Sequence, residues 1–352
     1  MCLLDLPPEI CSGIIHMYVR KNAWVAVTHA RLVCKTFAHA VHQDMFSRYS
    51  AAYYQHFRAS YERRLQDANM QNILFKLGPK RCHSTYLLDH IDATLDFLLG
   101  FEHHESQTQR ERHRYSLCSA VSAALSVDEI LHYLTIGPHD DSVGVRGSMG
   151  WADTIGMLAA AAATGIEPAV RFFINKVRDV GQSSELYGTL LLSAAITGRL
   201  NIFFSLYECI KDQKNVWRRL QYIISVCMRI GKGTLLPTLM GWCFNRCDQS
   251  KHIGRSKTLW AGWAAKTGNL HVLCTCYTPG LVPFYGCKLS TAEYKLACDH
   301  GHSSILRYFL REVVCPFGSS HRCELGRGLS VAANNGWGLA VNEILGWSCS
   351  AW

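Results

Sequence analysis

Apolar residues recur with helical spacing through most of the chain, and short turns that contain glycine separate the apolar runs. Two runs show the spacing clearly: Ile202, Phe203 and Leu206, and Ile305, Leu306, Phe309 and Leu310. Each follows a segment of small residues that ends in glycine, as in 193–198 and 296–301. Small side chains let helices approach closely, and glycine closes a helix in the left-handed conformation without steric cost. The pattern predicts an all-α fold of paired helices.

The turn glycines recur at nearly constant spacing along the C-terminal two thirds of the chain. Their intervals are 33, 33, 37, 33 and 35 residues, from Gly165 through Gly198, Gly231, Gly268, Gly301 and Gly336. A constant period of this size is the signature of stacked supersecondary units. One helix pair cannot bury its apolar face alone, whereas stacking on the next pair does. The sequence therefore predicts an array of helical repeats.

These segments resemble the ankyrin repeat, a unit of about 33 residues with an Ala-Ala-x-x-Gly turn between its helices. The resemblance covers 116–352 in about seven copies, of which those around Ser122 and Gly231 are weak. The family's Thr-Pro-Leu-His opening and the Asp-Gly tip of its loop are missing. The resemblance implies an ankyrin-like helical solenoid that binds a protein target. Another α-solenoid, or a globular helical domain with fortuitous glycines, is the alternative.

The N-terminus predicts a short helical module. The segment Leu4-Asp5-Leu6-Pro7-Pro8-Glu9-Ile10 favours a helix that starts near Pro7, since proline suits the first turn and Glu9 suits the positive helix end. We expect its apolar stripe to consist of Ile10, Ile14 and Ile15, and a second stripe to consist of Leu32, Val33, Phe37 and Val41. Three short helices in about 40 residues have a marginal core, which a partner helix would complete.

This module resembles an F-box, the motif with which a substrate receptor binds the Skp-type adaptor of a cullin-RING ubiquitin ligase. Leu-Pro-x-Glu-Ile and Leu-Val-Cys-Lys-x-Phe match its opening and closing in order and separation. The segment 19–29 departs from the family because it lacks the acidic-leucine stretch. A helix start on a capping domain is the alternative. The resemblance assigns these residues to the adaptor interface or its support: Leu6, Pro7, Pro8, Ile10, Ile14, Leu32, Val33, Cys34 and Phe37.

The chain thus divides into an F-box-like module at 1–42, a helical linker or cap at 43–115 and ankyrin-like repeats at 116–352. We expect one helical face in the linker to cover the first repeat, formed by Leu87, Leu88, Ile91, Leu95, Leu98 and Leu99. The polar run 103–114 is expected to be an exposed connection, and the glycine-containing stretch 137–150 a long inter-repeat loop.

Charge and hydropathy narrow the choice of partner. The net charge of +9 divides into +3 over 1–115 and +6 over the rest, in isolated basic pairs without the stripe that phosphate tracking requires. This charge pattern disfavours nucleic acid as the partner, although a non-specific anion-binding array is a third hypothesis.

The longest apolar run, 157–163, is far short of a membrane span, and no secretion signal is recognisable. We therefore expect a cytoplasmic or nuclear protein.

No catalytic, cofactor or metal site is expected. The sixteen cysteines include no Cys-x-x-Cys pair, and in a reducing compartment they are interpreted as small hydrophobes. Cys243, Cys247 and His252 have only a loosely metal-like spacing. Gly231-Lys232-Gly233-Thr234 lacks the glycine and strand of a phosphate loop, so we interpret it as a repeat turn.

Together the two resemblances imply a non-enzymatic substrate-recognition adaptor of an SCF-type ubiquitin ligase. Its partners would be the Skp-type adaptor, the cullin ligase and an unidentified protein target. Such pairings of modules occur in fungi and in large DNA viruses, and a viral protein would act inside the host cell. The alternative is an ankyrin-repeat scaffold that binds a protein without a link to ubiquitin ligase.

Overall fold

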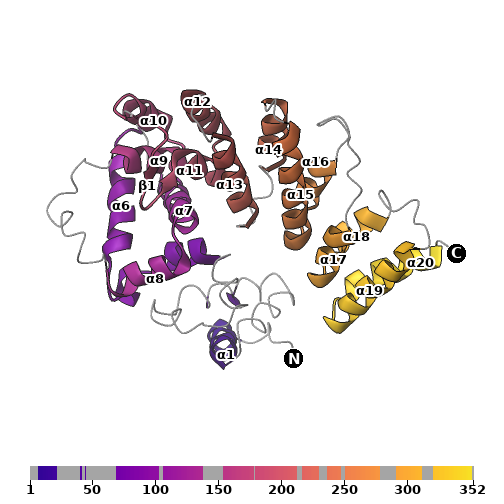
Figure 1. Ribbon diagram of the computed structural model, residues 1–352. Coiled ribbons are helices and arrows are strands. Elements are labelled where there is room, and N and C mark those ends of the chain that lie inside the picture. The colour runs from indigo at the N-terminus through magenta and orange to yellow at the C-terminus, as the bar shows by residue number, and fades with distance from the viewer. Residues whose placement is uncertain are drawn as a thin grey trace. The chain divides into compact units, whose positions relative to one another are not determined.

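The computed structural model describes residues 7–21, 40–41, 44, 69–102, 106–137, 154–177, 179–211, 216–229, 236–246, 250–277, 291–310 and 320–350. These residues are mostly helical, which confirms the all-α prediction (Figure 1). The chain forms two compact units, Met1–Gln213 and Lys214–Trp352. The division falls inside the segment that the sequence assigns to repeats.

The first unit contains most of the N-terminal helices and one small sheet. Its elements are α1 (Pro8–Lys21), η2 (Pro79–Arg81), α6 (Tyr86–Leu99), α7 (Gln107–Ala124), α8 (Val127–Thr135), α9 (Thr154–Thr164), α10 (Glu167–Ile174), β1 (Ser183–Ser184), β2 (Gly188–Thr189), α11 (Leu190–Thr197) and α12 (Leu200–Ile210). Residues 69–76 are also helical. Helix α9 packs against α7, α10 and α11, and its side chains from Leu158 to Thr164 are all buried.

Two predictions about the first unit have clear outcomes. The six leucine and isoleucine residues expected on one face of α6 are all buried, and α6 packs against α7. The prediction of an exposed connection at 103–114 is wrong from residue 107 onward, because α7 begins there. The side chain of Ser106 accepts a hydrogen bond from Gln109 N at 3.2 Å, and such a cap lets a polar sequence begin a helix.

A two-residue antiparallel hairpin precedes α11 and was not expected from the sequence. In this hairpin Ser183 pairs with Thr189, and Ser184 pairs with Gly188. Thr189 then caps α11 by accepting a hydrogen bond from Leu192 N at 3.3 Å. Because each strand has only two residues, no alternation of apolar and polar positions could have predicted it.

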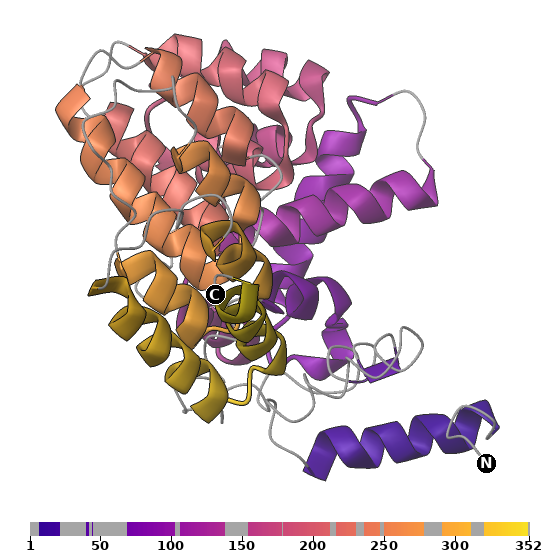
Figure 2. The same ribbon diagram turned by 90° about the vertical axis from the view of Figure 1, so that its right-hand side faces the viewer.

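The second unit consists of successive helix pairs. The pairs are α13 (Val216–Arg229) with α14 (Leu236–Arg246), α15 (Ser250–Thr267) with α16 (Leu270–Tyr277), α17 (Thr291–Asp299) with α18 (Ser303–Tyr308) and α19 (Ser320–Asn334) with α20 (Gly338–Ser350). The first helix of each pair contacts the first helix of the next, and the second helices do the same (Figures 1 and 2). The unit is therefore two adjoining rows of helices.

The predicted turn glycines adopt the left-handed conformation wherever the structure describes them. Their φ angles are 85° at Gly165, 83° at Gly198, 77° at Gly268, 71° at Gly301 and 72° at Gly336. Gly231 and the turn that contains it lie outside the described residues. A side chain at these positions would be strained, which explains why glycine recurs there.

The residue after a turn glycine covers the turn glycine of an earlier helix pair. A Cβ atom on Gly268 would lie 2.6 Å from His302 Nδ1, and one on Gly301 would lie 2.5 Å from the Trp337 ring. The same rings reach the carbonyl group two residues before the covered glycine. His302 Nε2 lies 2.9 Å from Lys266 O, and Trp337 Nε1 donates to Asp299 O at 3.4 Å. In the first unit Arg199 covers Gly165. We call these contacts the turn ladder.

Helix α8 provides a pH-dependence prediction. Ser126 N donates to Glu129 Oε2 at 2.7 Å, and Glu129 N donates to Ser126 Oγ at 3.3 Å. These hydrogen bonds favour the carboxylate and hold the pKa of Glu129 below its ordinary 4.5. A folded-state pKa below the unfolded one contributes stability above the unfolded value, and this stability is lost as the pH falls through the folded pKa.

We therefore expect Glu129→Gln to increase amide hydrogen exchange in α8 at pH 7 and to have little effect near pH 3. Since Glu129 is exposed and solvent screens the interaction, the expected effect at pH 7 is below about 1 kcal/mol. Hydrogen exchange measured by mass spectrometry at both pH values tests this. An equal effect at the two pH values would contradict it.

Candidate functional site

Helix α1 contains the described part of the predicted adaptor interface. Pro7 is exposed and its carbonyl accepts a hydrogen bond from Cys11 N at 3.0 Å, so the helix begins with Pro8 in its first position. Proline is well placed there because the first turn needs no backbone donor. Glu9 lies in the same turn and complements the positive helix end. The predicted helix start is thus confirmed.

The apolar residues of α1 divide between two faces. Ile15 and Val19 are buried, with 2% and 1% of their surface exposed. Ile10, Ile14 and Met17 are exposed by 54%, 42% and 47%, and their spacing of four and three residues places them along one side of the helix. The single stripe expected from Ile10, Ile14 and Ile15 is therefore wrong. Ile15 lies about 100° around the helix from Ile14, which directs it to the core.

The exposed stripe includes a residue that the sequence interpretation omitted. Met17 extends the line begun by Ile10 and Ile14 by one turn, and a search for apolar residues at helical spacing could have found it. The remaining predicted interface residues, Leu6, Leu32, Val33, Cys34 and Phe37, lie outside the described residues, as does the side chain of Pro8.

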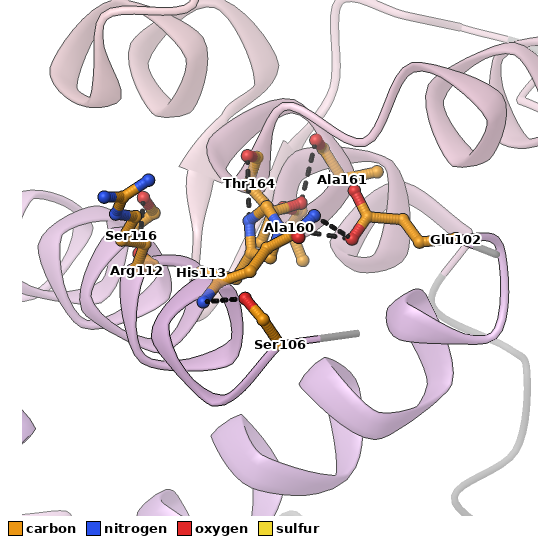
Figure 3. Close-up of polar contacts among 9 residues, drawn as sticks. Glu102, Ser106, Arg112, His113, Ser116, Ala160, Ala161 and Thr164 are labelled. Carbon is orange, nitrogen blue, oxygen red and sulfur yellow. Dashed lines mark hydrogen bonds and ion pairs between the residues drawn. The ribbon is translucent and has the colours of Figure 1, made fainter. Parts of the chain in front are cut away.

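A polar contact links α7 to the end of α9 (Figure 3). His113 is 6% exposed and its Nδ1 lies 3.1 Å from Thr164 O, so Nδ1 carries the proton because a carbonyl oxygen only accepts. His113 Nε2 lies 3.4 Å from Glu102 Oε2, and this carboxylate oxygen accepts a hydrogen bond from Gln109 Nε2 at 2.7 Å. Thr164 in turn donates to the α9 backbone at Ala160. These contacts attach α7 to the C-terminal end of α9.

An open groove lies along α15 and reaches α17 in the second unit. Its volume is about 670 Å³, and its lining is mostly apolar: Thr258, Leu259, Gly262, Trp263 and Lys266 from α15, and Leu296 from α17. Leu259 is 53% exposed, so the groove presents a large aliphatic side chain to solvent. Lys266 Nζ lies 5.3 Å from the centre of the Trp263 ring, within the range of a cation–π contact. We call this feature the α15–α17 groove.

One residue of the groove lining, Gly262, has no side chain. It lies inside α15 without a left-handed φ, and a Cβ atom there would meet only Leu296 Cδ1, at 3.9 Å. Neither backbone conformation nor packing therefore requires glycine. Inside a helix glycine is about 0.5–1 kcal/mol less favourable than alanine. At this position glycine leaves part of the groove lining without a side chain.

The charge of the chain is concentrated in one unit. From Lys214 to Trp352 the sequence contains 16 Lys and Arg against 6 Asp and Glu, a net charge of +10. From Met1 to Gln213 it contains 20 against 21, a net charge of −1. The earlier division at residue 115 hid this contrast. Helix α15 has Lys251, Arg255, Lys257 and Lys266 in its sequence and no acidic residue.

The described residues contain no group of three or more His, Cys, Asp or Glu side chains placed to hold a metal ion. Cys243 is buried, whereas Cys247 and the side chain of His252 are not among the described parts. Among the described helices no single one is long and apolar enough to cross a bilayer. Helices α7 and α8 meet that measure only together, with a bend of 117° between them.

Comparison with known proteins identifies no relative. No family model matches the chain, and no curated protein or solved structure matches it significantly. Two surfaces remain as candidate sites, one in each unit. They are the exposed stripe of α1 and the α15–α17 groove.

Proposed function

We propose that the chain is a substrate receptor of an SCF-type ubiquitin ligase. In this proposal the N-terminal F-box-like module binds a Skp-type adaptor, and the ankyrin-like helix pairs bind a protein target. The observation that carries the proposal is the exposed stripe of Ile10, Ile14 and Met17 on α1. This helix belongs to the segment with the Leu-Pro-x-Glu-Ile opening.

The chemistry of the stripe fits a helical partner. Three large apolar side chains on one side of a helix are the usual anchors for packing into a groove of another protein. Complete burial of one such side chain contributes about 1.5–3 kcal/mol, so the three together can supply a substantial part of a binding energy. Two of these residues, Ile10 and Ile14, are also the ones that the F-box resemblance assigns to the adaptor interface.

The function of the chain would be to create proximity. One module holds the adaptor and ligase while the helix pairs hold the target, so that a target lysine meets a ubiquitin-loaded enzyme at high effective concentration. Helix pairs joined by left-handed glycine turns support the ankyrin-like part of the proposal. All chemical steps would belong to the partner enzymes.

We expect Ile10→Asp combined with Ile14→Asp to weaken binding of the Skp-type adaptor at least a hundredfold. Loss of two anchors at about 1.5 kcal/mol or more each corresponds to this factor, and the new charges add a desolvation cost. Affinity of the purified full-length chain for the adaptor, measured by isothermal titration calorimetry, tests the expectation. Both positions are exposed in the free chain, so far-UV circular dichroism should not change.

A matched control is Leu339→Asp combined with Leu345→Asp in α20. These leucines are 73% and 43% exposed, and they belong to the second unit. The control should bind the adaptor as the unaltered chain does. If the unaltered chain does not bind a Skp-type adaptor, or if the α1 variant binds equally well, the proposal is wrong. Capture of a protein target under those conditions would instead support the scaffold function.

A further inference from the structure

We propose that the α15–α17 groove binds a segment of another protein in which an aromatic or aliphatic side chain is flanked by Asp or Glu. This inference deepens the proposed function by naming the class of target, and it rests on that function for the claim that the bound protein is a ligase target. The binding event itself needs no ligase, so the two claims can fail separately.

The shape and lining of the groove favour an apolar anchor. A volume of about 670 Å³ lies within the range of sites that bind compact ligands, and it accommodates large side chains rather than a whole domain. Leu259, Trp263 and Leu296 offer aliphatic and aromatic surface. Gly262 leaves the space between these side chains open, although alanine would suit the helix better. An aromatic or branched aliphatic side chain is the complementary occupant.

The charge of the second unit favours acidic residues beside that anchor. Lys266 lines the groove. Lys295 is exposed on α17, about 100° around the helix from the lining residue Leu296. Neither lysine forms an ion pair with a carboxylate of the described residues. Helix α15 has no acidic residue, and the whole unit has a net charge of +10. Complementary charge of this kind raises the association rate and selects against basic partners.

An acidic peptide fits these observations better than a nucleic acid does. Phosphate tracking needs several Lys or Arg side chains along a path, whereas among the described residues Lys266 is the one cation that lines this mostly apolar groove. Trp263 alone could stack on a base, but the aliphatic surface of Leu259 and Leu296 would then stay without a partner. Binding to a single strand is therefore an outcome that would overturn the inference.

The turn ladder holds one wall of the groove in place. His302 Nε2 lies 2.9 Å from the backbone oxygen of Lys266, and the His302 ring covers the turn glycine that follows α15. The end of α15 is thus attached to the turn between α17 and α18. A site that is already ordered loses less conformational entropy when a ligand binds.

Selection from a random peptide library tests the inference. Twelve-residue peptides displayed on phage are selected on the immobilised full-length chain, with the Gly262→Leu variant as the counter-selection. Leucine at this position fills the groove, while the 3.9 Å clearance to Leu296 avoids a backbone clash. The matched control is Gly241→Leu in α14, where a Cβ atom would meet nothing within 4 Å.

We expect the enriched peptides to combine one aromatic or aliphatic residue with at least two acidic neighbours. A fluorescein-labelled enriched peptide should bind the unaltered chain and Gly241→Leu equally, and Gly262→Leu and Lys266→Glu at least tenfold more weakly. Circular dichroism and thermal unfolding establish that each variant is folded. Gly262→Ala adds a second folding control, because it should raise the unfolding temperature.

Three results would overturn the inference. They are enrichment of basic or uncharged peptides, equal binding by Gly262→Leu, and tighter binding of a twelve-nucleotide oligothymidine than of the selected peptides. Loss of adaptor binding in the α1 variant does not affect this test. Conversely, failure of the peptide test leaves the adaptor interface intact, so each result can be attributed to one claim.

Discussion

Replacing Gly301 by alanine should destabilise the second unit by about 2–5 kcal/mol. Two costs combine at this position. An L-residue in the left-handed conformation costs about 1–2 kcal/mol, and the φ angle of Gly301 is 71°. In addition, the new Cβ atom would lie 2.5 Å from the Trp337 ring, and overpacking of this kind costs about 1–3 kcal/mol.

Gly336→Ala separates the two costs. Gly336 has nearly the same φ angle, 72°, but a Cβ atom there would meet nothing within 4 Å. This variant should therefore lose only the conformational part, about 1–2 kcal/mol. Urea unfolding of both variants, combined with hydrogen exchange in α17–α20, measures the difference. Equal destabilisation would mean that the turn ladder contributes no steric constraint at Gly301.

Replacing Ala161 by leucine should destabilise the first unit by about 1–3 kcal/mol or more. Helix α9 packs against α7, α10 and α11, and Ala161 has no exposed surface. Three added carbon atoms would therefore force a neighbouring helix to move. Protein interiors are close-packed, so such a volume cannot be absorbed without strain.

The control for this variant is Ala333→Leu, at an exposed position in α19. We expect its free energy of unfolding to change by no more than about 0.5 kcal/mol. Thermal and urea unfolding followed by circular dichroism provide the comparison. If Ala161→Leu proves as mild as Ala333→Leu, α9 is packed less tightly than the burial of residues 158–164 indicates.

The local features of the fold could be predicted from the sequence because short-range chemistry determines them. A turn that ends a helix in the left-handed conformation requires glycine, so the period of the glycines gives the positions of the helix pairs. The helix start near Pro7 likewise depends on neighbouring residues alone.

Features that depend on distant residues could not be predicted. Nothing local shows that His113 meets Thr164 and Glu102, because these residues come from three different segments. The two faces of α1 differ in burial only because of what packs against them. Gly262 is an unremarkable helix residue until Leu296 of α17 is seen beside it.

The charge contrast between the units belongs to a third class. It is present in the sequence, but it becomes visible only when the boundary between Gln213 and Lys214 is known. A count on either side of residue 115 mixes acidic and basic parts and gives two positive values, +3 and +6. Identification of the α15–α17 groove therefore required the structure for two reasons. The structure shows the geometry of the groove, and it gives the unit boundary from which the net charge of the second unit follows.

The turn ladder makes neighbouring helix pairs non-interchangeable. Arg199, His302 and Trp337 occupy the same place after their turn glycines, yet they differ in size and in the hydrogen bonds they make. A pair moved to another position would bring a side chain of the wrong shape to the preceding turn. Each described junction matches one covering side chain to one turn, so we expect a recombined chain to need the covering residue exchanged together with the turn it covers.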